Sequence, residues 1–432
     1  MGVLPLVVII FFTISGGPYG LEPLLYYCGG KGALFLLILT PLLWDIPIIL
    51  TVSELNCLLP MTGGYYQWIK RALGLRWAFY EGWWSWLCNF VDLAIYPQLL
   101  ILYASLFFPD IAAYKIPVCL LVIWGCAYLN ILGIRPVGKT SVILGILTLI
   151  PFIILFIIGV NHYPLTVHLE AFSYHDKTSF WGMAVFTIIW NFIGWDNVTT
   201  YVDEVKSPTR SYLKTMPIAF LLILILYFGV ILIAQNSGIS PAELKDKGFP
   251  ALGFYVSGKW LSVFISTGGI VSSIGMFIAV LLSISRIPEV MARDKLLPSK
   301  LYALHPKFKT PYISIITCAC IVSFMVLWTF GELLVIDVTV YFAGIILEFI
   351  SLILLRIKEP GTFRPFRIPL NTGLLSAMLV LPVAVYFLAL SDIIAKSKDS
   401  IKPILFAVLM ILSGEVAWQI IKLWNRRRAS VS

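Results

Sequence analysis

Six carboxylates lie inside long apolar stretches of the chain, where a charge is costly. They are Asp45, Asp92, Asp196 and Glu348 in the middle of their stretches, and Glu54 and Glu81 nearer one end. A charged side chain at the centre of a membrane helix costs at least about 2.5–3.5 kcal/mol, so such residues are usually functional. The sequence places no Lys or Arg at comparable depth. An acid-only interior suits a cationic ligand or proton carriage, because burial favours the neutral form of a carboxyl group. For Glu348, a hydrogen bond to a neighbouring helix is an equal alternative.

Glycine, proline and small polar residues interrupt two of the apolar stretches. One interruption reads Ser15-Gly-Gly-Pro-Tyr-Gly20 and the other reads Trp190-Asn-Phe-Ile-Gly-Trp-Asp-Asn197. A backbone amide or carbonyl freed in hydrocarbon costs several kcal/mol unless protein, water or a ligand satisfies it. Broken segments at corresponding positions of two halves indicate a central binding site. The two breaks therefore predict a small solute held in mid-membrane.

The first break is suited to an anionic group. We expect a half-helix to begin at about Pro18, with the amides of the break exposed at its start. Those amides belong to Gly16, Gly17 and Tyr19. The N-terminal end of a helix carries about half a positive charge, which suits a carboxylate, and glycines let a ligand approach the backbone. Glu22 opens the half-helix, where it either stabilises the helix or contacts an ammonium group. A packing kink is the alternative explanation for the break.

The elements that must position these groups are membrane helices. Of 432 residues, 59% are hydrophobic and 12% are charged, and the mean hydropathy is +0.93. A soluble domain of this length carries more polar surface. Since a membrane-spanning helix needs roughly 20 apolar residues, the sequence predicts an all-α polytopic membrane protein with about 12 transmembrane helices. The predicted spans are 3–27, 32–59, 77–108, 116–134, 140–160, 180–205, 213–235, 259–287, 311–330, 332–355, 373–395 and 401–424.

The net charge of +9 follows the predicted topology and does not indicate nucleic-acid binding. If the N-terminus is cytoplasmic, nine of the 31 Lys and Arg residues fall in outer loops, and the others lie in inner loops or the C-terminal tail. The nine are Lys31, Lys115, Lys177, Lys245, Lys247, Lys259, Lys396, Lys398 and Lys402. Basic residues in short loops favour the cytoplasmic side. We therefore expect an integral protein of a cell membrane, inner or plasma, with both termini in the cytoplasm.

The order of the spans predicts two related units. Residues 1–160 and 180–357 each hold five spans and each begin with a broken one, residues 372–424 add two helices, and residues 425–432 form a basic cytoplasmic tail. An odd number of spans places the second unit in the membrane in inverted topology, so the two breaks meet near the midplane. This is the LeuT-like 5+5 inverted repeat with broken helices 1 and 6.

Several motifs carry a family resemblance. They are Ser15-Gly-Gly-Pro-Tyr-Gly-Leu-Glu22, Ser53-Glu-Leu with Pro60-Met-Thr-Gly-Gly-Tyr-Tyr66, Glu81-Gly-Trp-Trp with Asp92 and Tyr96-Pro97, and Trp190-Asn with Gly194-Trp-Asp196 and Asp203-Glu-Val-Lys-Ser-Pro208. Through these motifs the chain resembles the amino acid–polyamine–organocation superfamily of transporters, and within it the polyamine-uptake branch of plants and trypanosomatids. The stretch from Ser285-Arg286 through Met291-Ala-Arg-Asp-Lys-Leu-Leu-Pro298 to Thr310-Pro311 is similar to the superfamily's loop after helix 8. The resemblance covers residues 1 to about 320.

The resemblance implies a substrate site between helices 1 and 6. Trp190 matches an aromatic residue that closes over the substrate in arginine/agmatine exchangers, and an indole face attracts an ammonium by about 0.5–2 kcal/mol. Trp195 is a candidate neighbouring wall. The expected substrate-binding residues are Ser15, Gly16, Gly17, Tyr19, Glu22, Asp45, Asp92, Trp190, Asn191, Gly194, Trp195 and Asp196.

The second predicted helix departs from the family pattern. The family has Ser-Ile-Pro-Glu here, whereas this chain has Asp45-Ile-Pro-Ile48. The carboxylate has moved back three residues, nearly one helical turn, so we expect it to reach the same space.

These features predict a secondary active transporter of amino acids or polyamines that works by alternating access, as a proton-coupled symporter. The candidate proton-coupling residues are Asp196, Glu54 and Glu81. An amino acid brings a carboxylate for the amides of the first break, whereas a polyamine brings only positive charge, and the sequence leaves the two open. A sodium site at the broken helices, an exchanger and a non-transporting nutrient sensor are the alternatives.

Other function classes lack their residues. An intramembrane enzyme needs a catalytic constellation at one depth, but no His falls within a predicted span. The seven Cys form no CxxC pair, so we expect neither a metal site nor a cofactor. A channel would show a repeated filter or a ring of charges. The expected partners are a small amine and the lipid bilayer, with no nucleic acid, and the sequence does not determine an oligomeric state.

Overall fold

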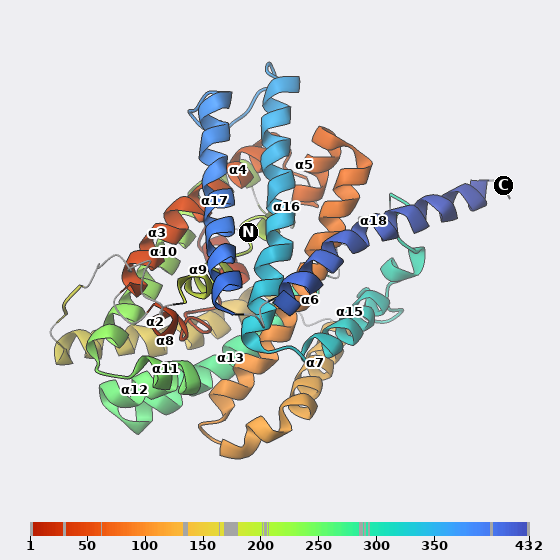
Figure 1. Cartoon of the computed structure of the whole chain (residues 1–432). Coiled ribbons are helices and arrows are strands. Elements are labelled where there is room, and N and C mark those ends of the chain that lie inside the picture. Colours follow the sequence, from red (N-terminus) through yellow and green to blue (C-terminus); the bar gives the residue numbers. More distant parts are fainter. Residues whose placement is uncertain are drawn as a thin grey trace.

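The computed structural model describes residues 3–28, 32–61, 63–132, 137–163, 165–167, 180–200, 202, 205, 207–284, 288, 291–292, 294–397 and 401–429. Within these ranges the chain forms helices and turns and no strand (Figure 1), which confirms the all-α prediction. Some residues used in the sequence argument lie outside the described residues: Lys31, Arg135, Lys177, Asp203, Glu204, Lys206, Ser285, Arg286, Arg293 and Lys398.

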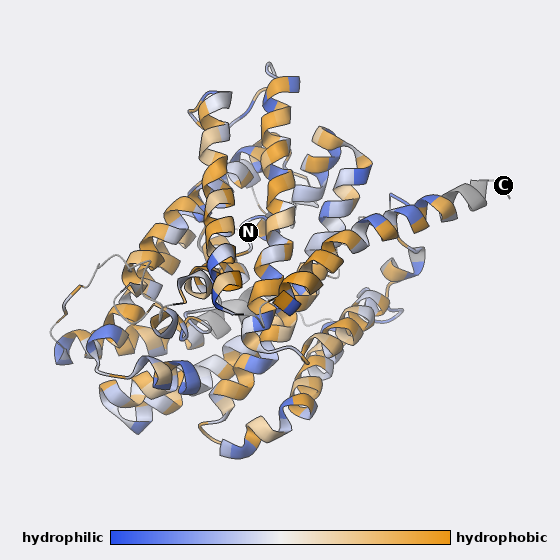
Figure 2. Ribbon diagram, viewed as in Figure 1, coloured by the Kyte–Doolittle hydropathy of each residue, from blue (hydrophilic) through white to orange (hydrophobic). Residues whose placement is uncertain are grey.

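Eight helices of the described chain are long and apolar enough to cross a membrane. They are Ala33–Leu58, Leu75–Ala104, Pro109–Leu132, Pro208–Asn236, Lys259–Leu281, Phe330–Lys358, Thr372–Lys396 and Ile401–Trp424. Three other predicted spans correspond to shorter apolar helices, Leu147–His162, Trp181–Trp190 and Tyr312–Met325. The prediction of a polytopic helical membrane protein is confirmed, and Figure 2 shows hydrophobic residues along the helices.

The first predicted span is broken, as expected, but the break is longer than expected. Helix α1 (Val3–Ile14) ends before Ser15, and the chain becomes helical again only at α2 (Leu24–Tyr27). The expected half-helix start at Pro18 is therefore wrong. Gly16, Gly17 and Gly20 have φ of 58°, 108° and 90°. A right-handed helix requires negative φ, so these glycines hold the segment open.

The second predicted break is present at the expected place. Helix α9 (Trp181–Trp190) ends at the tryptophan, and only a short 3₁₀ turn, η2 (Asn197–Thr199), follows. Gly194 has a φ of 113°, which stops the helix. A Cβ at Gly194 would lie 3.3 Å from the carbonyl oxygen of Thr13 in α1. The glycine thus lets the two broken segments approach each other.

The predicted span 32–59 is divided into α3 (Ala33–Leu43) and α4 (Asp45–Leu58). Pro47 explains the division, because a proline lacks the N–H that would bond the carbonyl four residues earlier and its ring clashes with that carbonyl. The division brings Asp45 to the first turn of α4, where it is fully buried.

Three helices form in connections that we expected to be loops. They are α5 (Gly64–Leu73), before α6, and α11 (Pro241–Lys247) and α12 (Phe249–Ser257), between α10 and α13. Gly74, with a φ of 95°, separates α5 from α6.

Helix α6 (Leu75–Ala104) is the centre of the bundle. It packs extensively against α16 (Phe330–Lys358) and α13 (Lys259–Ile284), while α1 packs against α10 (Pro208–Asn236) and α8 (Val137–His162). Helices α7 (Lys115–Leu132) and α15 (Tyr312–Met325) pack against each other, whereas α17 (Thr372–Lys396) and α18 (Ile401–Ala429) are largely exposed. In Figure 1, α18 extends away from the bundle toward the C-terminus. Mutually packed α6 and α16 therefore form the frame on which the site residues lie.

Candidate functional site

The two breaks share one hydrogen-bonding partner, the buried hydroxyl of Tyr227 on α10. This hydroxyl donates to Ser15 Oγ at 2.6 Å and lies 3.2 Å from the carbonyl oxygens of Gly17 and Asn191. Ser15 and Gly17 belong to the first break and Asn191 belongs to the second. Three predicted site residues are thus brought together by a residue that the sequence analysis missed. The sequence feature that could have identified Tyr227 was its position in the middle of the predicted span 213–235.

The backbone of the first break is bonded within the protein. The amide of Gly16 donates to the carbonyl of Phe11 at 3.2 Å, and that of Gly17 donates to Ser15 Oγ at 3.1 Å. Ser272 of α13 donates to the carbonyl of Gly16 at 2.7 Å. A substrate carboxylate would have to replace the Phe11 carbonyl and Ser15 Oγ to bind the amides of Gly16 and Gly17.

Glu22 lies two residues before α2, with Pro23 between them, and its carboxylate stabilises the first break. One carboxylate oxygen accepts the Gly20 amide at 2.6 Å and the other accepts the Tyr103 hydroxyl at 2.7 Å. Tyr19 packs edge-on against Tyr103, and its hydroxyl donates to the carbonyl of Ile265 at 2.9 Å. Both predicted site residues therefore join the break to α6 and α13.

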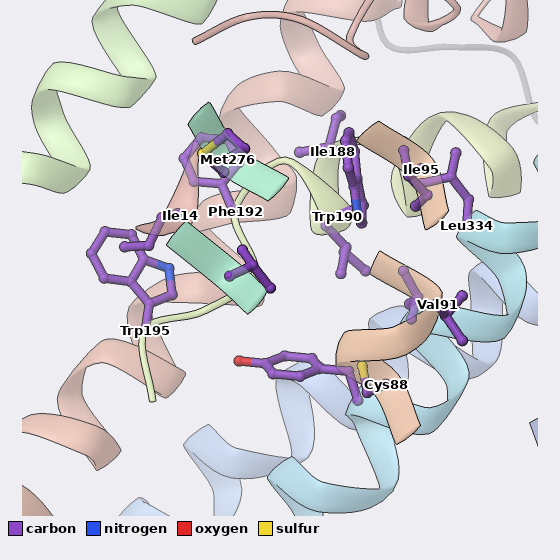
Figure 3. Packing of buried hydrophobic residues seen from close by; sticks show 14 of the residues in the cluster. Ile14, Cys88, Val91, Ile95, Ile188, Trp190, Phe192, Trp195, Met276 and Leu334 are labelled. Atoms are coloured by element: carbon purple, nitrogen blue, oxygen red, sulfur yellow. The ribbon is translucent and has the colours of Figure 1, made fainter. Parts of the chain in front are cut away.

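Trp190 connects the second break to the first break and to α6. Its indole N–H donates to Asp92 Oδ1 at 3.0 Å, and the Tyr96 hydroxyl donates to Asp92 Oδ2 at 2.8 Å. A Cβ at Gly20 would lie 2.5 Å from the indole ring, so the ring rests on the backbone of the first break. Figure 3 shows Trp190 beside Val91 and Ile95 of α6.

Beyond Trp190, the second break turns toward other elements. In Figure 3, Trp195 lies on the opposite side from Trp190. Its indole N–H donates to Asp45 Oδ1 at 3.3 Å, and no described residue forms a hydrogen bond with Asp45 Oδ2. Asp196 Oδ1 accepts the Tyr341 hydroxyl of α16 at 3.0 Å. Asn191 donates to the carbonyl of Thr187 at 2.9 Å, and its own Oδ1 accepts no hydrogen bond from the described residues.

Glu54 has cationic partners, which corrects the expectation of an acid-only interior. Arg356 of α16 binds both oxygens of Glu54, with Nε 2.8 Å from Oε1, and Arg364 Nε lies 3.5 Å from Oε1. The Ile368 amide also donates to Glu54 Oε2 at 2.8 Å. The sequence analysis missed this pairing because α16 continues to Lys358, three residues beyond the predicted span end at 355.

Glu81 and Glu348 lie on facing sides of α6 and α16. Ser85 donates to Glu81 Oε1 at 2.9 Å, whereas Glu81 Oε2 and both oxygens of Glu348 have no hydrogen-bond partner in the part of the chain that the structure describes. A Cβ at Gly344 would lie 2.7 Å from Glu81 Oε1. Glu348 is one helical turn beyond Gly344 on the same face, and the two glutamates interact electrostatically.

Asp337 of α16 is a further buried acid that the sequence analysis missed. Its Oδ1 accepts the Cys88 thiol at 3.0 Å, and its Oδ2 has no hydrogen-bond partner within the described residues. Asp337 lies near the start of the predicted span 332–355, and an acid inside a predicted span was the sequence feature that could have identified it.

Ion pairs connect α5 to other elements. The Lys70 ammonium and the Tyr66 hydroxyl both lie 2.6 Å from Asp294 Oδ2. Arg71 binds Glu359 through two hydrogen bonds of 2.9 and 2.7 Å, and these bonds lower the pKa of the Glu359 carboxyl group. Helix α5 is thereby fastened to the segments before α15 and after α16.

The described residues contain no group of three or more His, Cys, Asp and Glu side chains placed to hold a metal ion. The groups that gather around the two breaks are instead carboxylates, phenol hydroxyls and indole rings. Such groups are suited to an organic cation, because carboxylates supply charge and aromatic faces supply cation–π attraction.

Comparison with known proteins gives consistent matches over most of the chain. The family model described as "Amino acid permease" matches residues 2–413. An Arabidopsis thaliana protein named as a probable polyamine transporter is 34% identical over 88% of this chain and 79% of its own. A polyamine transporter of Oryza sativa subsp. japonica is 30% identical over 90% of this chain and 73% of its own. A serine/threonine exchanger of Bacillus subtilis is 26% identical over 86% of each chain.

Proposed function

Because the chain belongs to the amino acid permease family, we propose that it is a secondary active transporter that moves amino acids or polyamines across a cell membrane by alternating access. The observation that carries the proposal is the junction of Trp190, Asp92 and the first break. The Trp190 indole there contacts both the half-buried carboxylate of Asp92 and the backbone of Gly20. Movement of either broken segment must therefore change the surroundings of that carboxylate.

The substrate amine is held between the two breaks in this proposal. Trp190 closes one side and offers its ring face to the ammonium. Asp92 and Asp196 supply negative charge, and Asp196 is buried whereas Asp92 is half-buried. Asp45 and Trp195 form a wall behind the second break, which is supported by their hydrogen bond. Ser15 and Asn191 are held in place through Tyr227.

The transport cycle follows from an inverted repeat of residues 1–160 and 180–357. One broken helix from each unit meets the other at Gly194 and Thr13, as such a repeat requires. Helices α17 and α18 lie outside the repeat, consistent with their exposed apolar faces. The distribution of Lys and Arg supports cytoplasmic termini in a plasma or inner membrane.

Proton coupling in this scheme uses Asp196 and Glu81. The two acids interact electrostatically, and within the described chain Glu81 Oε2 has no hydrogen-bond partner. Two neighbouring buried carboxyl groups do not both ionise readily, so one of them takes up a proton or a cation. We assign Glu54, the third predicted coupling residue, to the ion cluster with Arg356 instead, because its charge is already neutralised.

Uptake into proteoliposomes tests the proposal. The full chain is reconstituted and given an inward proton gradient, with radiolabelled putrescine and arginine in parallel. We expect gradient-dependent uptake of an amine in wild type and its loss in Asp196→Asn. Asp246→Asn, a change at an exposed residue of α11, is the matched control and should transport normally.

Other outcomes assign other functions. Uptake that requires sodium in place of the proton gradient would refute proton coupling but would leave the proposed transport function intact. An amino acid exchanger is the second candidate, supported by the similarity to a serine/threonine exchanger. It predicts uptake only into vesicles preloaded with amino acid. Absence of flux in both assays, with binding retained, would identify a sensor.

A further inference from the structure

Buried acids of α6 and α16 extend well beyond the Trp190 junction, and Asp337 and Glu348 have no role in the scheme above. We propose that these acids form a ladder of ammonium-binding positions that selects long linear polyamines over short diamines. The acid ladder consists of Asp92, Asp337, Asp196, Glu81 and Glu348. Asp337 is its outer anchor and Glu348 its inner anchor. This inference rests on the proposed amine transport and adds the property of the substrate that the site selects, which is the length of the polyamine.

Asp337 and Asp92 form the outer rung of the acid ladder. Asp337 is fully buried, and its unpartnered Oδ2 lies beside a weak thiol donor and the charge of Asp92. Aromatic rings surround the Asp92 side of the rung, because Trp190 packs 6.5 Å from Tyr96 and 5.9 Å from Phe330 between ring centroids. A carboxylate within aromatic rings is a suitable environment for an alkylammonium group.

Glu81 and Glu348 form the inner rung. Both are almost completely buried, and three of their four carboxylate oxygens have no hydrogen-bond partner among the described residues. Glu81 reaches across to α16 at Gly344, one turn from Glu348. A buried carboxylate oxygen without a donor is costly, so these three oxygens point to a ligand or proton that satisfies them.

Asp196 lies between the two rungs. Tyr341, which donates to Asp196, is one helical turn from Asp337 on α16. Asp196 also interacts electrostatically with Glu81 and with Glu348. The acid ladder is therefore continuous from the Trp190 junction to the inner rung.

The spacing of the rungs indicates the length of the ligand. Asp92 and Glu81 are eleven residues apart on α6, and Asp337 and Glu348 are eleven residues apart on α16. At the helical rise per residue, both pairs are separated by about 16 Å along the helix axis. Extended spermine spans about this length, and its inner amines can face Asp196. The shorter putrescine can contact one rung and Asp196 but cannot reach both rungs.

The acid ladder lacks the cations that neutralise a structural acid. Among the described residues, no Lys or Arg forms an ion pair with any of its five members. Neighbouring buried carboxylates cannot all be charged without counterions. A row of ammonium groups would supply them, whereas protons alone would give a site with no preference for length.

The test compares amines of increasing length in proteoliposomes holding the full chain. Radiolabelled putrescine, spermidine and spermine are supplied to wild type, Asp337→Asn and the exposed control Asp246→Asn. We expect Asp337→Asn to raise the half-saturating concentration of spermine by about tenfold or more, because one charged contact is lost. Putrescine should change by less than about twofold, since it can bind without the outer rung. The control should match wild type for all three amines.

An equal change for all three amines in Asp337→Asn, or no change for any, would overturn the acid ladder while leaving the proposed function intact. If Asp337→Asn is not recovered as a monodisperse protein, wild type decides the question. Its half-saturating concentration should fall from putrescine to spermine, and equal values would overturn the inference. Wild type that carries amino acids but none of the three amines would refute both polyamine transport and the acid ladder.

Discussion

Two buried acidic regions of this protein differ in how their charge is compensated. Glu54 receives two arginines and a backbone amide, so every oxygen of that carboxylate has a charged or polar donor. The acid ladder contains five carboxyl groups, four on α6 and α16 and one, Asp196, in the second break, and within the described chain the side chains that donate to them are neutral hydroxyl, indole and thiol groups. A neutralised acid holds elements together, whereas unneutralised acids hold negative charge ready for a cation. The difference separates a structural site from a candidate transport site.

The same substitution in the two regions provides the largest expected contrast. Glu54→Gln leaves the Arg356 guanidinium buried without a counterion, and such a loss costs about 3–5 kcal/mol. Glu348→Gln removes an unpartnered acid and should leave stability unchanged or slightly higher, because it removes a charge that burial disfavours. Thermal unfolding of both purified variants measures the contrast. Similar losses in the two variants would mean that the acid ladder is also structural.

Replacing the whole ion pair sharpens the comparison further. Glu54→Leu combined with Arg356→Met should recover most of the stability that Glu54→Gln loses, to within about 1–2 kcal/mol of wild type. The physical reason is that the double change removes both charges of the Glu54–Arg356 pair together, while Arg364 keeps its hydrogen bonds to the carbonyls of Leu355, Glu359 and Thr362. The unfolding temperature of the double variant measures this recovery. A double variant as unstable as Glu54→Gln would show that the arginine contacts to Ile368 and Leu370 carbonyls dominate.

Trp190→Phe tests the junction of Trp190 and Asp92 at the outer rung of the acid ladder. Phenylalanine keeps an aromatic face but loses the N–H that donates to Asp92. We expect amine uptake to fall by about tenfold, since one hydrogen bond to a charged group is lost, with little change in unfolding temperature. Trp260→Phe, at an exposed tryptophan of α13, is the matched control. Unchanged uptake in Trp190→Phe would remove the indole N–H from the mechanism.

The ion pair between Arg71 and Glu359 should have the smallest effect. Arg71→Gln is expected to cost less than about 1 kcal/mol, because the pair is partly exposed to solvent. Arg71 lowers the pKa of Glu359, so its stabilisation is present above the ordinary glutamate pKa of about 4.3 and is lost as pH falls through the lowered value. Unfolding temperatures at pH 7 and at low pH measure this. A larger loss at low pH than at pH 7 would contradict the assignment.

Much of the fold and part of the site were predictable from local sequence. The two breaks were predictable because glycines and a proline interrupt apolar stretches that would otherwise be helical. Trp190, Asp92 and Asp196 were identified as candidate site residues because charged and aromatic side chains in the middle of a predicted span are unusual. The predicted start of the half-helix at Pro18 was wrong, since the positive φ of Gly20 keeps the chain open as far as Pro23. Proline position alone does not reveal that conformation.

Partners across helices were not predictable in the same way. Tyr227 lies more than 200 residues from Ser15, and Arg356 lies about 300 residues from Glu54. Asp337 resembles any acid near the end of a span until Cys88 and Asp92 are placed beside it. Such pairings depend on which faces of α6, α10 and α16 meet, and a one-residue rotation of a helix changes that face by about 100°.

The sequence by itself determined a helical membrane protein, the positions where two helices break and the depth of the buried acids, because hydropathy and glycine conformation act locally along the chain. The tertiary structure decided which of those acids are neutralised and which are not. That distinction depends on the distance from each carboxylate to a cation of another helix, and electrostatic energy falls with distance through space, regardless of separation along the chain.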